Sequence, residues 1–147
     1  MKIVVGSDHG GFQFKEAIKN HLLNKGYEVI DVGTSNESRC NYPDYAIAAG
    51  EKVVNGEAKY GFIVCTTGIG ISIAANKVKG IRCAQVYDLF TAEMAKAHNN
   101  ANFIAFGGRV NYSVPVKDMI EKFMTTNFAG GRHERRVARI MDIEKND

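Results

Sequence analysis

The 147-residue sequence contains no tryptophan, only two prolines and only three cysteines. The cysteines are Cys40, Cys65 and Cys83, and no two of them form a Cys-x-x-Cys pair. An odd number of unpaired cysteines argues against a disulfide framework and against a cysteine-based zinc site. Histidine and the acidic residues also show no metal-ligand spacing, so we expect no metal.

The sequence has no run of about eighteen apolar residues, and Met1-Lys2 leads directly into Ile3-Val4-Val5. We therefore expect no membrane helix and no signal peptide, and a soluble, cytoplasmic protein. A net charge of +3, from 19 basic and 16 acidic residues, is too small to indicate nucleic acid. Only segment 132–139, Arg-His-Glu-Arg-Arg-Val-Ala-Arg, is strongly basic, and it indicates an anionic partner.

The length and the hydrophobic content of 45% suit one compact domain over residues 1–147. Short β-branched runs alternate with segments whose apolar residues have helical spacing, such as Phe14, Ile18 and Leu22. This alternation predicts a Rossmann-like, doubly wound α/β fold with three αβα layers and a five-stranded parallel sheet. The strand-like runs are 3–5, 27–32, 60–64, 81–86 and 102–106.

In such sheets the ligand lies beyond the carboxyl ends of the strands. Three predicted strand ends carry glycine or reactive groups, namely segments 6–11, 65–70 and 107–109. The segment Asn41-Tyr42-Pro43-Asp44 opens a further helix with a phenol and a carboxylate. We expect the chemistry of the protein to be gathered at this edge.

Cys65 ends an apolar strand and precedes a glycine-rich turn into a helix, a position that favours a thiolate base or nucleophile. The alternative is a small buried apolar residue, which is our expectation for Cys83. Gly68-Ile69-Gly70 suits an oxyanion or phosphate, or is simply a tight connection. A dinucleotide site would need a third glycine where Ile73 stands, and no Gly-Lys-Ser/Thr sequence indicates a P-loop.

The polar candidates each have a structural alternative. Asp8 and His9 follow the first strand, where Asp8 is also a good N-cap. His98 closes the fourth helix, where it can act as an acid or base or merely cap the helix. Arg132 and Arg136 share a helix face and with Arg109 suit a phosphate clamp, whereas a solvated basic face or a nucleic-acid stripe is the alternative.

Taken together, these motifs resemble the B-type ribose-5-phosphate isomerases and related sugar-phosphate isomerases over nearly the whole chain. The matching motifs are Ser7-Asp8-His9-Gly10-Gly11, Tyr42-Pro43-Asp44, Cys65 with 67–77, His98-Asn99, and Gly130-Gly131-Arg132-His133 with Arg136-Val137. The resemblance implies interconversion of ribose 5-phosphate and ribulose 5-phosphate through a cis-enediol(ate), without metal or cofactor. It also implies a homodimer, with a tetramer left open. The active site would lie between subunits, and a C-terminal helix from about residue 132 would reach the partner.

By the same resemblance, Cys65 is the base that moves a proton between C2 and C1, and Thr67 assists proton transfer between the oxygens. His98 and Asp8 would open the sugar ring. The implied substrate-binding residues are His9, Tyr42, Thr66, Gly68, Ile69, Gly70, Asn99, Arg109, Arg132 and Arg136. A preorganised set of N–H groups that stabilises the enediolate is a sound physical basis for this chemistry.

Thr66 stands where the family usually has glycine. Because a β-branched residue with positive φ would be an outlier, we predict a negative φ for Thr66. Hexose 6-phosphates of the allose or galactose type are alternative substrates. A non-catalytic nucleotide-binding α/β module is the rival hypothesis, but it leaves Cys65 and His98 without a role.

Overall fold

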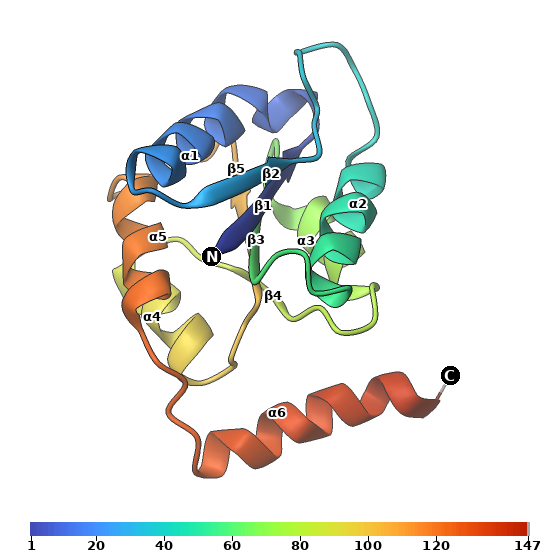
Figure 1. Cartoon of the computed structure of the whole chain (residues 1–147), viewed down its shortest axis with the longest axis vertical. Coiled ribbons are helices and arrows are strands. Elements are labelled where there is room, and N and C mark those ends of the chain that lie inside the picture. The colour runs from blue at the N-terminus through green and yellow to red at the C-terminus, as the bar shows by residue number, and fades with distance from the viewer. Residues whose placement is uncertain (147) are drawn as a thin grey trace.

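The computed structural model describes residues 1–146, in which helices alternate with the strands of a five-stranded sheet (Figure 1). The strands are β1 (Lys2–Ser7), β2 (Glu28–Asp31), β3 (Tyr60–Cys65), β4 (Cys83–Gln85) and β5 (Phe103–Gly107). The helices are α1 (Phe12–Asn24), α2 (Tyr42–Val54), α3 (Ile69–Asn76), α4 (Leu89–Ala97), α5 (Val116–Thr125) and α6 (Arg132–Asp142). Two short 3₁₀ helices span His9–Gly11 and Ile143–Asn146.

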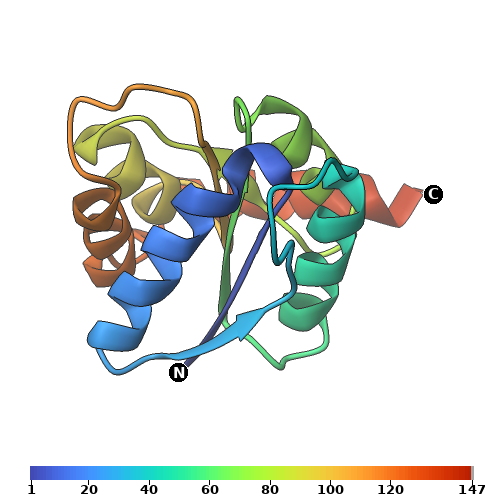
Figure 2. The same cartoon turned by 90° about the horizontal axis from the view of Figure 1, so that it is seen from above.

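All strand pairings are parallel, in the order β2-β1-β3-β5-β4. Figure 2 shows α1, α4 and α5 on one face of the sheet and α2 and α3 on the other. The predicted three-layer fold with a five-stranded parallel sheet is therefore confirmed. Within residues 1–146, no helix has the length and apolar character needed to cross a membrane.

The central strands are buried on both faces, which is why they appear in the sequence as continuous apolar runs. Every residue of β3 and β5 is buried. In β1, Ile3 and Val5 join the core beneath α1, α4 and α5, whereas Val4 joins the core beneath α2 and α3. Alternate side chains of one strand thus pack against the helices on both faces of the sheet.

The edge strand β4 is shorter than predicted and spans only Cys83–Gln85. Ile81 and Val86, the first and last residues of the predicted strand, are buried but lie outside β4. Cys83 is half-buried rather than fully enclosed, and burial raises the pKa of its thiol. The expectation of a buried Cys83 is therefore met only in part, and its structural role stays a prediction.

The strand order creates a topological switch point between β1 and β3. From β1 the chain crosses to β2 on one side, then returns to the other side for β3. The helices that follow β1 and β3 therefore lie on opposite faces, and the carboxyl ends of these two strands leave a crevice for a ligand. Asp8 and Cys65 stand at these two strand ends.

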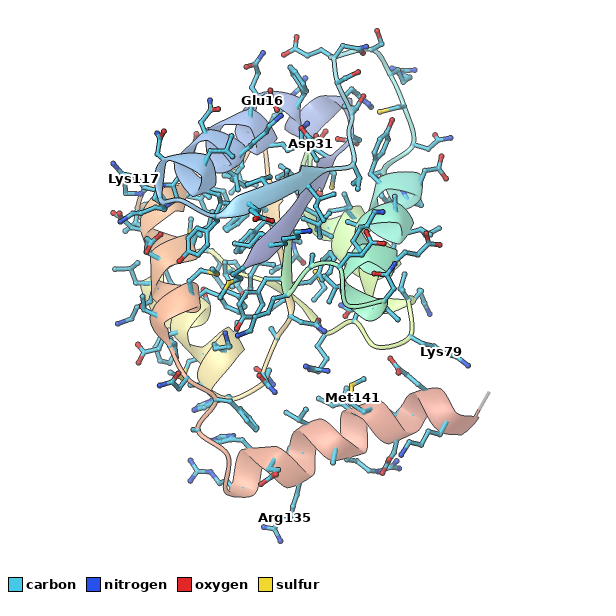
Figure 3. All side chains as sticks on the ribbon, viewed as in Figure 1. Glu16, Asp31, Lys79, Lys117, Arg135 and Met141 are labelled. Carbon is cyan, nitrogen blue, oxygen red and sulfur yellow. The ribbon has the colours of Figure 1, made fainter. Side chains whose placement is uncertain are left out.

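Helix α6 lies at the end of the sheet opposite the strand ends that carry Asp8 and Cys65, and it is seen below the rest of the molecule in Figure 1. Just before α6, the N–H of Ala129 donates to the carbonyl of Ala97, the last residue of α4. At the other end, the Glu144 carboxylate accepts the N–H of Gly80 at 2.9 Å. In Figure 3, Arg135 points away from the body and Met141 points toward it. The predicted helix from residue 132 is present, but it adds nothing to the main core.

Candidate active site

Cys65, the last residue of β3, lies at the switch point with 4% of its surface exposed. The N–H of Gly68 donates to its Sγ at 3.2 Å. Gly68 caps α3 with a φ of 82°, a left-handed conformation in which glycine carries no steric cost. Cys65 Sγ therefore lies beside the backbone N–H groups of the turn that opens α3.

Thr66 contacts the loop that follows β1. A Cβ added to Gly10 would overlap Thr66 Oγ1, and one added to Gly108 would overlap the carbonyl of Gly10. Among the described residues other than glycine, only Asn100 has a positive φ, so the predicted negative φ of Thr66 is confirmed. The three glycine-bearing strand ends thus pack backbone against backbone, which accommodates the threonine.

Asp8 and His9 adjoin this cluster. Asp8 Oδ1 accepts hydrogen bonds from the N–H groups of Gly10 and Gly11 at 2.9 and 3.2 Å. Asp8 therefore acts as the N-cap of the 3₁₀ helix His9–Gly11 through this oxygen. His9 is half-buried and lines a depression of about 350 Å³ together with Arg109. Glu37 also lines this depression, where its carboxylate accepts a hydrogen bond from Gln13. The imidazole and the guanidinium suit an anionic ligand on their side of the depression.

On the other side of Cys65, the N–H of Ile69 donates to Thr67 Oγ1 at 3.2 Å. Thr67 is exposed, so its hydroxyl is accessible. Tyr42 packs over Gly70, where a Cβ would come within 2.7 Å of the tyrosine hydroxyl oxygen. Gly70 therefore makes room for the phenol, a role that the sequence pattern did not reveal.

The candidates described so far form the strand-end group: Asp8, His9, Tyr42, Cys65 to Gly70, and Arg109. The other four, His98, Asn99, Arg132 and Arg136, form the opposite-edge group. Lys96 lies two residues before His98 and hydrogen-bonds Tyr60. Tyr60 is the first residue of β3, and Cys65 is the last. At about 3.3 Å per residue, Tyr60 and Cys65 lie roughly 16 Å apart along β3, so the two groups lie near opposite ends of this strand.

The opposite-edge group is built around two stacked histidines. The rings of His98 and His133 lie 4.0 Å apart with an interplanar angle of 12°. Burial, followed by the charges of His98, Arg132 and Arg136, lowers the pKa of His133. The imidazole stack therefore places the start of α6 and its arginines beside the end of α4.

A single chain keeps apart the three arginines that the sequence analysis grouped around a phosphate. Arg109 lies near His9, whereas Arg132 begins α6 at the opposite edge, so the three arginines do not form one clamp. Each helix between parallel strands returns the chain to the amino edge of the sheet. Residues that follow a helix, such as His98 and Asn99, therefore lie far from residues that follow a strand.

The structure also places three residues that the sequence analysis did not single out near these groups. Cys40 contacts His9, Lys15 is buried beside Asp31, and Lys96 is buried below His98. A lysine within the apolar face of a predicted helix was an available signal for Lys15. Within residues 1–146, no group of three or more histidine, cysteine or acidic side chains is arranged to hold a metal ion.

Comparison with known proteins gives the family of the chain. Residues 3–140 match the Ribose/Galactose Isomerase family. The chain belongs to this family. Among its curated relatives, ribose-5-phosphate isomerase B of Escherichia coli (strain K12) is 42% identical over 144 residues, which cover 98% of this chain and 97% of the relative.

Galactose-6-phosphate isomerase subunit LacB of Clostridium acetobutylicum is also 42% identical, over 100% of this chain and 86% of the relative. Among solved structures, ribose-5-phosphate isomerase B of Clostridium thermocellum superimposes with a TM-score of 0.96 at 45% identity, with 99% of each chain covered. The chain is therefore a member of an isomerase family whose relatives are named for pentose and hexose phosphates.

Proposed function

We propose that the protein interconverts ribose 5-phosphate and ribulose 5-phosphate through a cis-enediolate, with Cys65 as the base. The observation that carries this proposal is the position of the Cys65 thiol. It lies at the switch point of the sheet, accepts the Gly68 N–H at 3.2 Å and is next to an exposed threonine hydroxyl. The similarity to ribose-5-phosphate isomerase B supports the choice of substrate.

In the proposed reaction, the Cys65 thiolate removes the proton from C2 of the open-chain aldose. The C2–H electrons form the C1=C2 bond, and the carbonyl electrons move to O1, which gives the enediolate. Thr67 assists transfer of the O2 proton to O1, and Cys65 returns its proton to C1, which leaves the ketone at C2. The Gly68 and Ile69 amides donate to Cys65 and Thr67 in the absence of substrate. In the proposed complex, the amides of the turn 68–70 donate instead to the oxygen on which negative charge develops.

The proposed active unit is a homodimer, because one chain does not bring its two groups of candidate residues together. In a dimer, His98, Asn99, Arg132 and Arg136 of the second copy complete the strand-end group of the first. His98 of the second copy and the Asp8 carboxylate then serve ring opening. His9 and Arg109 of one chain and the two α6 arginines of the other hold the phosphate.

Exposed apolar surface beside both groups supports this dimer. Ile69 and Ile73, one helical turn apart on α3, are 54% and 57% exposed next to the Cys65 turn. A cleft of about 500 Å³ lies between α6 and the β4 edge. Apolar residues, including Ile140, line it together with the polar or charged residues Asn76, Arg82, Asn99 and Glu144. Burying the α3 face of one copy against this cleft of the other would remove apolar surface from water at the completed site.

A hexose 6-phosphate isomerase is the second candidate. LacB and ribose-5-phosphate isomerase B of E. coli are equally identical to this chain, so overall identity does not select the substrate. The strand-end motif Asp8-His9-Gly10-Gly11 and the α6 arginines favour the pentose, because they are among the motifs that carry the resemblance to the B-type ribose-5-phosphate isomerases. Initial rates with ribose 5-phosphate, allose 6-phosphate and galactose 6-phosphate test this order, and a hexose preferred by the enzyme would reverse it.

The proposed base is tested by solvent deuterium exchange at C2 of ribose 5-phosphate. We expect Cys65→Ala to bind the sugar phosphate and to incorporate no deuterium, whereas Cys83→Ala retains the exchange. Full exchange by Cys65→Ala would assign the base to another group. Absence of both exchange and ribulose 5-phosphate formation in the unchanged protein, with ribose 5-phosphate bound, would refute the isomerase itself and favour a binding module.

A further inference from the structure

The segment 32–41, which connects β2 to α2, contacts the site at His9. The backbone N–H of Cys40 donates a hydrogen bond of 3.2 Å to His9 Nδ1. An N–H group donates only to a ring nitrogen with a free lone pair, so this nitrogen carries no proton. In a neutral histidine, the proton then lies on Nε2.

We propose that segment 32–41, through the Cys40 amide, holds His9 in its Nε2–H tautomer and thereby makes it a donor to the substrate phosphate. A neutral imidazole has one donor and one acceptor nitrogen, and only the donor attracts a phosphate oxygen. The amide occupies the acceptor, which leaves the donor for an anion in the depression shared with Arg109. This inference rests on the proposed function, which assigns His9 to phosphate binding.

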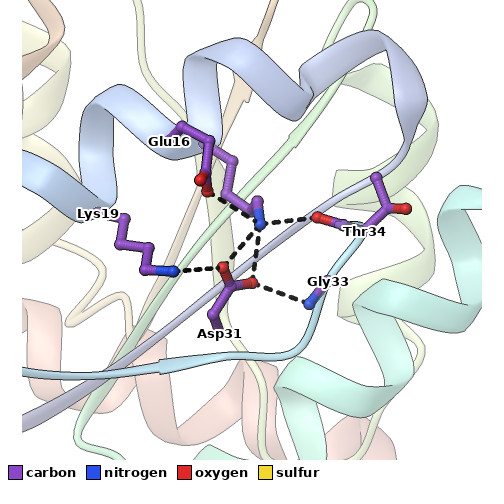
Figure 4. A network of polar contacts seen from close by, with 6 residues as sticks. Glu16, Lys19, Asp31, Gly33 and Thr34 are labelled. Carbon is purple, nitrogen blue, oxygen red and sulfur yellow. Dashed lines mark hydrogen bonds and ion pairs between the residues drawn. The ribbon is translucent and has the colours of Figure 1, made fainter. Parts of the chain in front are cut away.

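A buried lysine fixes the start of the segment. The Lys15 side chain is 1% exposed, and its Nζ lies 2.8 Å from an Asp31 carboxylate oxygen and 2.8 Å from the carbonyl oxygen of Thr34 (Figure 4). Burial acts to raise the pKa of Asp31, but hydrogen bonds from Lys15, the Gly33 amide and Lys19 hold it below its usual value. The carboxylate is thus ionised and clamps the turn that opens the segment.

Two further contacts fix the segment along its length. Ser7 exchanges backbone hydrogen bonds with the turn, donating to Gly33 at 2.7 Å and accepting from Thr34 at 2.8 Å. The Gln13 side-chain amide donates to Glu37 at 2.9 Å. Ser7, Gln13 and Lys15 all flank His9 in the chain. The amide of Cys40 and the ring that it contacts are therefore fixed to the same end of β1 and α1.

Nitrogen NMR of the substrate-free protein, labelled with ¹⁵N-histidine, tests the tautomer directly. At about pH 8, where free histidine is neutral, we expect an unprotonated Nδ1 and a protonated Nε2 for His9. A His9→Asn variant identifies the signals. A protonated Nδ1, or shifts averaged between the tautomers, would overturn the proposal. Because no substrate is present, this result does not depend on whether the protein is an isomerase.

Two substitutions separate the amide from the thiol, whose Sγ lies 3.9 Å from His9 Nδ1. Cys40→Ala keeps the N–H, and Cys40→Pro removes it. We expect Cys40→Ala to keep the Nε2–H tautomer. Cys40→Pro should show a tautomer mixture and a KM for ribose 5-phosphate raised about tenfold, with kcat changed less.

If Cys40→Pro folds and matches Cys40→Ala in tautomer and KM, the amide has no positioning role. Should Cys40→Pro fail to fold, Glu37→Ala removes the hydrogen bond between Gln13 and the exposed Glu37 and so loosens the same segment. This variant should then show partial exchange of His9 between its two tautomers. A single, unchanged tautomer in Glu37→Ala would refute the role of the segment in holding His9. Titration with inorganic phosphate should shift the His9 Nε2 signal, and no shift would contradict its role as a phosphate donor.

Discussion

Lys96 is a buried cation whose replacement by an apolar residue should stabilise the protein. It lies in the last turn of α4, is 7% exposed and hydrogen-bonds the Tyr60 hydroxyl. Its Nζ lies 4.1 Å from the ring centre of Tyr60 and 4.5 Å from that of Phe123. Burial, followed by the charge of Lys59, lowers the pKa of Lys96 from 10.5 to about 8.

The size of the effect follows from this pKa. Since one pKa unit corresponds to about 1.36 kcal/mol, the charged form is disfavoured in the folded state by about 3 kcal/mol. Attraction to the two aromatic rings offsets about 1–2 kcal/mol of this penalty. Because the folded pKa is lowered, the unfolded chain binds more protons between about pH 8 and 10.5. The stability contribution of Lys96 therefore rises with pH through this window.

Urea unfolding of the unchanged protein and Lys96→Met, at one protein concentration, measures the effect. We expect Lys96→Met to be more stable by about 1–2 kcal/mol at about pH 7, and this advantage to shrink at about pH 10. Lys59→Met is the matched control, because removing that charge should move the pH window upward. A Lys96→Met variant that is less stable at about pH 7, or a difference independent of pH, would refute the reasoning.

Three further predictions concern particular residues. Asp31→Asn should lower stability by about 2–3 kcal/mol near neutral pH. Because the folded pKa of Asp31 is lowered, this loss should disappear as pH falls through that value in acid unfolding. Gly61→Ala should lower stability by about 1–3 kcal/mol in thermal unfolding, because its Cβ would overlap an aromatic ring. Gly26 lies in open space with a φ of 86°, so Gly26→Ala should cost about 1–2 kcal/mol through backbone strain alone. Gly70→Ala should displace Tyr42 and raise KM more than it alters stability.

The layered fold was predictable because local and global preferences agree in this sequence. Continuous apolar runs form the doubly buried strands β3 and β5, and helically spaced apolar residues such as Ile18 and Leu22 cover them. The edge strand β4 was predicted too long. At an edge only one ladder of hydrogen bonds holds the chain, and apolar content alone does not show where that ladder ends.

The contacts that shape the strand-end group were less predictable, because they depend on backbone positions distant in sequence. Nothing in the sequence pairs the amide of Cys40 with the ring of His9, thirty-one residues away. The same holds for Thr66, whose side chain fits only because Gly10 lies against it. Glycine in these loops suggested phosphate-binding amides, but the structure shows that close packing of neighbouring loops also requires it.

The two-chain character of the proposed site follows from the alternation of strands and helices. A residue that follows a strand lies at the carboxyl edge of a parallel sheet, and one that follows a helix lies at the amino edge. Cys65 follows β3, whereas His98 follows α4, so their separation is a property of the topology. Two copies related by a twofold axis bring opposite edges together twice and form two identical sites. Mixed Cys65→Ala and Arg136→Ala chains should then regain activity, because one site of each hybrid dimer receives both native residues. No recovery after proven subunit exchange would show that one chain supplies both.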